Sequence, residues 1–166
     1  MSVNIALLTV TDTRTFDNDK SGAILVKKFQ EANHNLIERK ICKDNKEDIL
    51  LILKDWINKK EIDVVITTGG TGLTGRDITP EAIDLIADKQ IPGFGEMFRN
   101  ISIKSVGTSA IQSRACAVLA NGKYIFALPG SSGGVTDAWE EILKYQLDIN
   151  HKPCNFVELF PRLKEK

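Results

Sequence analysis

Several features that would point to a specialised environment are absent from this sequence of 166 residues. It holds three cysteines, Cys42, Cys116 and Cys154, whose wide spacing matches no metal-binding or disulfide pattern. An odd number of unpatterned cysteines favours a reducing compartment and free thiols that serve as small apolar core residues. The first residues lack a basic segment, and their apolar run is too short for a signal peptide or a membrane span. We therefore expect a cytoplasmic protein with no membrane partner.

An excess of charge of one sign is also absent, since Lys plus Arg is 22 and Asp plus Glu is 22. This balance gives no extended positive field that would attract nucleic acid, so we expect no nucleic-acid partner. Any site for an anion must be local, built from a few side chains and backbone amides.

The two common nucleotide-binding motifs are missing as well. There is no GxxxxGK[ST] sequence, and no GxGxxG follows the first predicted strand. The two histidines, His34 and His151, are isolated, which argues against a histidine-based metal site or a Ser-His-Asp triad. These absences lower the case for P-loop and nicotinamide-dependent proteins.

What the chain does contain is an alternation of strand and helix patterns. Apolar or β-branched runs alternate with segments of helical spacing, and Asn121-Gly122 predicts a hairpin. The pattern predicts an α/β fold, a three-layer α/β/α sandwich with a mostly parallel sheet and one antiparallel strand. The length fits one domain over residues 1–166. The predicted strands are 3–10, 36–42, 62–68, 115–120 and 124–128.

Capping residues predict where three helices begin. Ser21 can cap the first helix, Asp44-Asn45-Lys46-Glu47 looks like a capping box, and Thr79 is expected to cap a helix whose first turn holds Pro80. Residues 93–103 are a further helix candidate. The tail from His151 contains two prolines and is expected to be irregular.

The strongest candidate for chemistry is the turn Thr67–Gly72, which directly follows the best predicted strand. In parallel α/β sheets, ligands bind beyond the carboxyl ends of the strands. Glycines at Gly69, Gly70 and Gly72 let backbone amides approach an anion, and Thr68 and Thr71 add hydroxyl donors. One glycine would indicate no more than a tight turn, but three with flanking threonines favour a ligand site.

A second glycine-rich turn also follows a strand and precedes a helix. It contains Pro129, Gly130, Ser131 and Ser132, and a helix that begins there can bind phosphate through its unpaired amides. Without a partner histidine, the two serines are expected to be ligand donors rather than nucleophiles. A plain strand-to-helix turn is the alternative.

Two aspartates lie where they can serve such a site. Asp77 stands between the first glycine turn and the Thr79-Pro80 helix start, and a carboxylate beside phosphate makes sense if Mg²⁺ lies between them. An exposed loop aspartate is the alternative for Asp77. The spacing of Asp44 is explained at least as well by helix capping.

Three segments together resemble the MoaB/Mog family of molybdenum cofactor biosynthesis. They are Thr-Thr-Gly-Gly-Thr-Gly at 67–72, Arg-Asp-Ile-Thr-Pro-Glu-Ala at 76–82 and Pro-Gly-Phe-Gly-Glu-Met-Phe-Arg at 92–99. Asp-Thr-Arg-Thr at 12–15 and Lys-Pro-Cys-Asn-Phe at 152–156 are similar to the MoaB branch in particular. The resemblance implies a molybdopterin-binding fold and the adenylylation of molybdopterin, in which molybdopterin phosphate attacks the α-phosphorus of Mg-ATP and pyrophosphate leaves.

By the same resemblance, the first glycine turn holds the pterin and nucleotide phosphates, and Pro129–Ser131 forms a second ligand turn. Asp77 and Asp44 match the two acidic positions of the family, with Asp77 acting through Mg²⁺, and Glu96 is expected to bind ligand or cap a helix. Ser132 stands where other members often have proline. The expected substrates are molybdopterin and ATP, the expected assembly is a homotrimer or homohexamer, and a MoeA-type protein inserts the metal later.

Two other functions remain open from the residues alone. A MoaB-branch protein can bind molybdopterin or act as a scaffold without catalysis, although the presence of both Asp44 and Asp77 favours catalysis. An unrelated flavodoxin-like nucleotide-binding module is the third reading.

Overall fold

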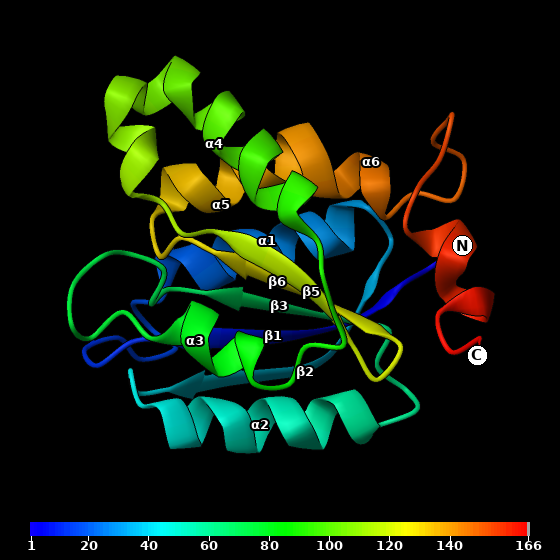
Figure 1. Cartoon of the computed structure of the whole chain (residues 1–166), viewed down its shortest axis with the longest axis horizontal. Helices are drawn as coiled ribbons and strands as arrows, with labels where there is room; N and C mark the ends of the chain where they lie inside the picture. Colours follow the sequence, from blue (N-terminus) through cyan, green and yellow to red (C-terminus); the bar gives the residue numbers. More distant parts are fainter. Residues whose placement is uncertain (166) are drawn as a thin grey trace.

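A six-stranded sheet with strand order β2-β1-β3-β6-β5-β4 forms the centre of the computed structural model, which describes residues 1–165 (Figure 1). Strands β2, β1, β3 and β6 run parallel, whereas β5 is antiparallel to both of its neighbours. The predicted mostly parallel sheet with one antiparallel strand is thus confirmed. The strands are β1 (Asn4–Val10), β2 (Asn35–Cys42), β3 (Val64–Thr68), β4 (Lys89–Gln90), β5 (Cys116–Ala120) and β6 (Lys123–Leu128).

Helices cover both faces of the sheet and complete the three layers (Figure 1). Helices α1, α4, α5 and α6 lie on one face, and α2 and α3 lie on the other. The helices are α1 (Lys20–Glu31), α2 (Lys46–Asn58), α3 (Thr79–Asp84), α4 (Pro92–Val106), α5 (Ser132–Ala138) and α6 (Lys144–Gln146). A 3₁₀ segment, η1 (Gly107–Gln112), extends α4, and a π-helical segment, η2 (Trp139–Leu143), joins α5 to α6.

The central strands are apolar because both of their faces are buried. Every residue of β3 and β6 is buried. On the α1 side, Phe126 packs in one cluster with Phe29 and Trp139, and on the α2 side Val65 packs with Trp56. These two clusters hold the sheet between its two layers of helices, and so they also position the ends of its strands.

The capping residue predicted for each of the three helices α1, α2 and α3 is wrong. Asp19, not Ser21, caps α1 by accepting a hydrogen bond from the amide of Gly22. Asn45, not Asp44, caps α2 by accepting from the amide of Asp48. Thr79 lies inside α3, because its hydroxyl instead donates to the carbonyl of Gly69. Each correction frees or commits a side chain near the carboxyl edge of the sheet.

Other differences from the prediction are smaller. The structure adds the two-residue strand β4, extends α4 to Val106 and turns part of the tail into a 3₁₀ segment, η3 (Val157–Arg162). The cysteines were expected to be core residues, but Cys42 and Cys116 are half-buried and Cys154 is exposed. Burial raises the pKa of Cys42 to about 12. Within residues 1–165, no helix is long and apolar enough to span a bilayer.

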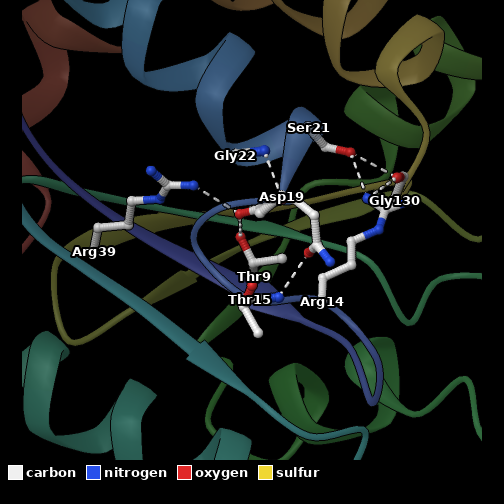
Figure 2. Close-up of polar contacts among 9 residues, drawn as sticks. Thr9, Arg14, Thr15, Asp19, Ser21, Gly22, Arg39 and Gly130 are labelled. Carbon is white, nitrogen blue, oxygen red and sulfur yellow. Dashed lines mark hydrogen bonds and ion pairs between the residues drawn. The ribbon is translucent and has the colours of Figure 1, made fainter.

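The start of α1 is held by a buried ion pair, which Figure 2 shows in close-up. The Asp19 carboxylate accepts hydrogen bonds from the Thr9 hydroxyl (2.6 Å), the Gly22 amide (3.0 Å) and Arg39 (2.9 Å). Its side chain has no exposed surface. Asp19 therefore ties the end of β1 to β2 and to the first turn of α1.

We expect Asp19→Ala to lower the free energy of unfolding at neutral pH by roughly 3 kcal/mol, because it removes a helix cap and leaves Arg39 without its partner. Chemical denaturation of the two proteins measures the loss. Asp17→Ala, at an exposed position two residues earlier, should change it by less than about 0.5 kcal/mol.

The loss should also depend on pH with a defined sign. Burial raises the pKa of Asp19, but hydrogen bonds from Thr9, Gly22 and Arg39 more than offset it, so the pKa lies below its ordinary value of 3.8. The stabilisation is then complete above that ordinary value and is lost as the pH falls through the lower pKa of the folded protein. An undiminished gap between wild type and variant at the acid end would contradict this reading.

Candidate functional site

A cleft of about 930 Å³ opens where β1, β3 and β6 end. Its floor is made by the segments that leave these strands, and one wall is made by α4 and η1, which contribute Phe98, Val106 and several serines. In Figure 1 the segments after β1 and β3 form loops at the same end of the sheet. The volume is that of a small-molecule site, with apolar surface on one side and polar backbone on the other.

The turn after β3 depends on glycine at two positions. Gly69 and Gly70 have φ angles of +100° and +68°, a region that other residues rarely adopt. A Cβ atom at Gly69 would overlap the carbonyl oxygen of Val10, and one at Gly70 would overlap the hydroxyl of Thr79. The turn is therefore pressed against β1 on one side and α3 on the other.

Two backbone amides of this turn have no hydrogen-bond partner in the described chain, and both of their residues line the cleft. The Gly69 amide donates to Leu128 across the sheet at 3.0 Å, but within the described chain the amides of Gly70 and Thr71 donate to no group. The Thr68 hydroxyl, predicted as a ligand donor, instead donates to the Pro129 carbonyl at 2.8 Å. The turn thus offers two neighbouring N–H groups, an arrangement that suits an anion.

Carboxylates stand over the two ends of the turn. A Cβ atom at Gly70 would lie 3.1 Å from Oδ1 of Asp44, and one at Gly72 would lie 2.7 Å from Oδ2 of Asp77. Asp44 reaches this place because Asn45 has taken over the capping of α2. The structure therefore brings Asp44, from the loop between β2 and α2, to the loop between β3 and α3 that carries both the glycine turn and Asp77.

The two carboxylates differ in their protonation chemistry. Burial raises the pKa of Asp44, and the nearby charges of Asp12 and Asp77 raise it further. Burial also raises the pKa of Asp77, but hydrogen bonds from the hydroxyl and amide of Thr74, at 2.7 and 2.9 Å, help to bring it below its ordinary value. Asp77 is therefore the more firmly ionised of the pair.

Arg114 is a site residue whose role the sequence did not reveal. Its guanidinium donates to the carbonyls of Gly72 (2.7 Å) and Asp77 (2.8 Å) and pairs with Glu81. Its own amide donates to Thr71 at 3.0 Å. Arg114 thus holds the loop that carries the first glycine turn and Asp77. No local pattern could have shown this, since Gly72 lies 42 positions away.

The second glycine-rich turn touches the first. A Cβ atom at Gly130 would lie 3.2 Å from Cα of Gly69, and Pro129, Gly130 and Ser131 all line the cleft. Ser131 caps α5 by accepting from the Gly134 amide at 3.1 Å. The two glycine turns therefore form one continuous surface at the floor of the cleft.

Two predicted site residues lie elsewhere. Ser132 is exposed in the first turn of α5 and does not line the cleft. Glu96 is exposed on α4 and also lies outside the cleft, and it caps no helix because α4 begins after Ile91. Both were proposed from residue type and motif, which say nothing about the direction in which a helix presents a side chain.

A mostly parallel sheet with a glycine-floored cleft at its carboxyl edge defines a small-molecule binding domain, and comparison with known proteins gives the class. The family described as "Probable molybdopterin binding domain" matches residues 6–149. The chain belongs to this family, which includes the MoaB/Mog proteins, and its role lies in molybdenum cofactor biosynthesis.

Relatives of known name agree over nearly the whole chain. Molybdenum cofactor biosynthesis protein B of Escherichia coli is 44% identical over 161 residues, covering 97% of this chain and 93% of that protein. The Bacillus cereus protein of the same name is 42% identical over 146 residues, covering 87% and 86%. The expectation of an unrelated flavodoxin-like module is therefore dropped.

Solved structures share the fold. A crystal structure of a molybdenum cofactor biosynthesis protein B superposes with a TM-score of 0.89 at 38% identity, covering 100% of this chain and 98% of that one. The tungsten cofactor synthesizing protein MoaB from Pyrococcus furiosus superposes with a TM-score of 0.77 at 36% identity, covering 85% and 90%.

The glycine requirement of the first turn gives a direct prediction. We expect Gly70→Ala to lower the free energy of unfolding by roughly 1 to 3 kcal/mol, because alanine is strained at this φ angle and its Cβ displaces Thr79. Gly133→Ala is the matched control, since its Cβ meets no atom within 4 Å and alanine favours the helix. Thermal unfolding should show Gly133→Ala at or above wild type. Equal stability of the two variants would contradict the assigned turn geometry.

Proposed function

We propose that this protein binds molybdopterin and ATP in the cleft and transfers the adenylyl group of ATP to the phosphate of molybdopterin. The products are adenylyl-molybdopterin and pyrophosphate. The observation that carries this proposal is the pair of open amides at Gly70 and Thr71, which lie between the carboxylates of Asp44 and Asp77. This combination suits a ligand that carries phosphate together with a cation.

The donor set fits Mg²⁺ that is shared with substrate. Among the described residues no group of three or more His, Cys, Asp or Glu side chains could hold a metal alone. Mg²⁺, however, is commonly held by one or two carboxylates and completes its coordination with water and substrate phosphates. Asp77 and Asp44 would hold it here, and it would neutralise phosphate charge.

The side chains of the cleft act by placing the reactants. Phosphoryl and nucleotidyl transfer asks a protein mainly for alignment and for neutralisation of charge, and it requires no nucleophilic side chain. The amides of Gly70 and Thr71 donate to phosphate oxygens, and Arg114 keeps the loop bearing them in position. The apolar wall at Phe98 and Val106 accepts a flat ring system.

Removing the charge of Asp77 should stop catalysis and spare binding. We expect Asp77→Asn to lower the rate of pyrophosphate release from molybdopterin, ATP and Mg²⁺ by at least roughly 100-fold, as for loss of a charge that stabilises a transition state. Molybdopterin should still bind, because the open amides remain. Asp84→Asn, at an exposed position on α3 outside the cleft, should keep the wild-type rate.

The same assay decides between catalysis and binding alone. Folded wild-type protein that binds molybdopterin but releases no pyrophosphate would overturn the transferase and favour a non-catalytic binding or scaffold role in the same pathway. A MoeA-type protein is the proposed recipient of the product, since metal insertion follows adenylylation.

We also propose a homotrimer or homohexamer. Met97, Ile103 and Ile111 are all more than half exposed along α4 and η1, which is a concentration of apolar side chains that favours a subunit contact. We expect light scattering to give a multiple of the chain mass, and Ile111→Asp to reduce it. Leu51→Asp on α2, at a position 73% exposed, is the control and should leave the mass unchanged. A wild-type monomer at micromolar concentration would contradict the proposal.

A further inference from the structure

The cleft is poor in positive charge for a site that is to hold phosphate. Among the described residues that line it, Arg14 is the one cationic side chain, whereas Asp44, Asp77 and Asp137 bring three carboxylates. The side chains that line the cleft therefore carry a net negative charge. A phosphate must be attracted by the unpaired amides, by a bound cation and by Arg14.

Other arginines near the cleft are already engaged. Arg76 is paired with Asp12, and Arg114 is bound to two carbonyls and to Glu81. Neither lines the cleft. Arg14 therefore has no substitute as a side-chain cation for a ligand lying on the glycine turns.

Arg14 is held at one nitrogen and open at the others. Its Nη1 donates to the Ser21 hydroxyl and to the Gly130 carbonyl, both at 3.0 Å (Figure 2). The N–H groups on Nε and Nη2 donate to no group in the described part of the chain. A guanidinium with one edge anchored and another free is suited to bidentate binding of a phosphate.

The residues that anchor Arg14 are themselves held by hydrogen bonds. Ser21 is fully buried and donates to the same Gly130 carbonyl at 2.7 Å. The loop between β1 and α1 is folded back by the bond from the Asp19 amide to the Thr15 carbonyl, at 2.9 Å. Asp19 in turn is fixed by its buried carboxylate. Because these bonds order the Arg14 side chain before a ligand arrives, ligand binding loses little conformational entropy.

The anchoring carbonyl also fixes where Arg14 can act. Gly130 lies against Gly69, so the arginine is placed at the junction of the two glycine turns. Asp44 and Asp77 stand at the other side of the first turn, over Gly70 and Gly72. The floor of the cleft is thus polarised, with the cation at one end and the acids at the other.

We propose that Arg14 binds a phosphate group of the ligand at the junction of the two turns and thereby selects phosphorylated ligands over their dephosphorylated forms. This assignment rests on the proposed function only in its choice of ligands, molybdopterin and ATP. The shared chemistry is a phosphate, and the pterin and the nucleotide are its two sources.

The test compares Arg14→Gln, Arg14→Lys and wild type by calorimetric titration under anaerobic conditions. The ligand pairs are molybdopterin with and without its phosphate, and Mg-ATP with adenosine. Arg162→Gln is the matched control, because Arg162 is an exposed arginine in the tail. Melting temperatures of all four proteins verify that they are folded.

We expect Arg14→Gln to weaken binding of a phosphorylated ligand by roughly 10- to 100-fold, the range for a charge-assisted hydrogen bond, and to leave its dephosphorylated partner within twofold. Arg14→Lys should recover part of the loss, since it keeps the charge but not the fork. The ligand pair that shows the effect identifies the source of the phosphate. Arg162→Gln should bind both pairs like wild type.

Each other outcome is decisive. Unchanged affinity of Arg14→Gln for both phosphorylated ligands overturns this inference and leaves the proposed function standing. Equal losses for phosphorylated and dephosphorylated ligands also overturn it, because they indicate a disturbed Gly130 turn. If wild type releases no pyrophosphate but still selects phosphorylated ligands through Arg14, the proposed adenylyl transfer is overturned and the inference about Arg14 is supported. Failure of wild type to bind either phosphorylated ligand overturns both.

Discussion

The site depends on one backbone constraint, the pair of positive φ angles at Gly69 and Gly70 immediately after the central strand β3. This geometry turns the chain sharply against β1 and leaves the amides of Gly70 and Thr71 without partners in the described chain. Unpaired amides are costly unless water or a ligand meets them. The rest of the edge of the sheet is arranged to keep this turn in place and to bring charge to it.

Three side chains from different segments of the chain hold this region. The Thr79 hydroxyl from α3 donates to the Gly69 carbonyl, Arg114 holds the following loop, and Asp19 fixes the loop that carries Arg14. Stability and function are therefore linked here through shared residues. A cleft whose loops are held by hydrogen bonds within the protein suits a reaction whose main requirement is alignment of two phosphate-bearing substrates.

The sequence predicted the glycine turns because glycine and strand patterns are local signals. It predicted the sheet for the same reason. The sequence could not show whether Asp44 or Asn45 caps α2, since both residue types are good caps. In the structure Asn45 is the cap, and the Asp44 amide donates to Asp12. The ion pair of Asp19 with Arg39 and the role of Arg114 were missed because the partners lie 20 and 42 positions away along the chain. Glu96 and Ser132 lie outside the cleft, and a motif does not specify which way a helix faces.

The central claim is that main-chain amides at the first glycine turn receive the phosphate of the ligand. It is tested most directly by NMR titration of ¹⁵N-labelled protein with molybdopterin, following the amide resonances of Gly70 and Thr71. The account predicts large downfield proton shifts at these two amides and none at Gly122, which lies in the β5–β6 turn. Saturating ligand that leaves the Gly70 and Thr71 resonances unmoved would contradict it.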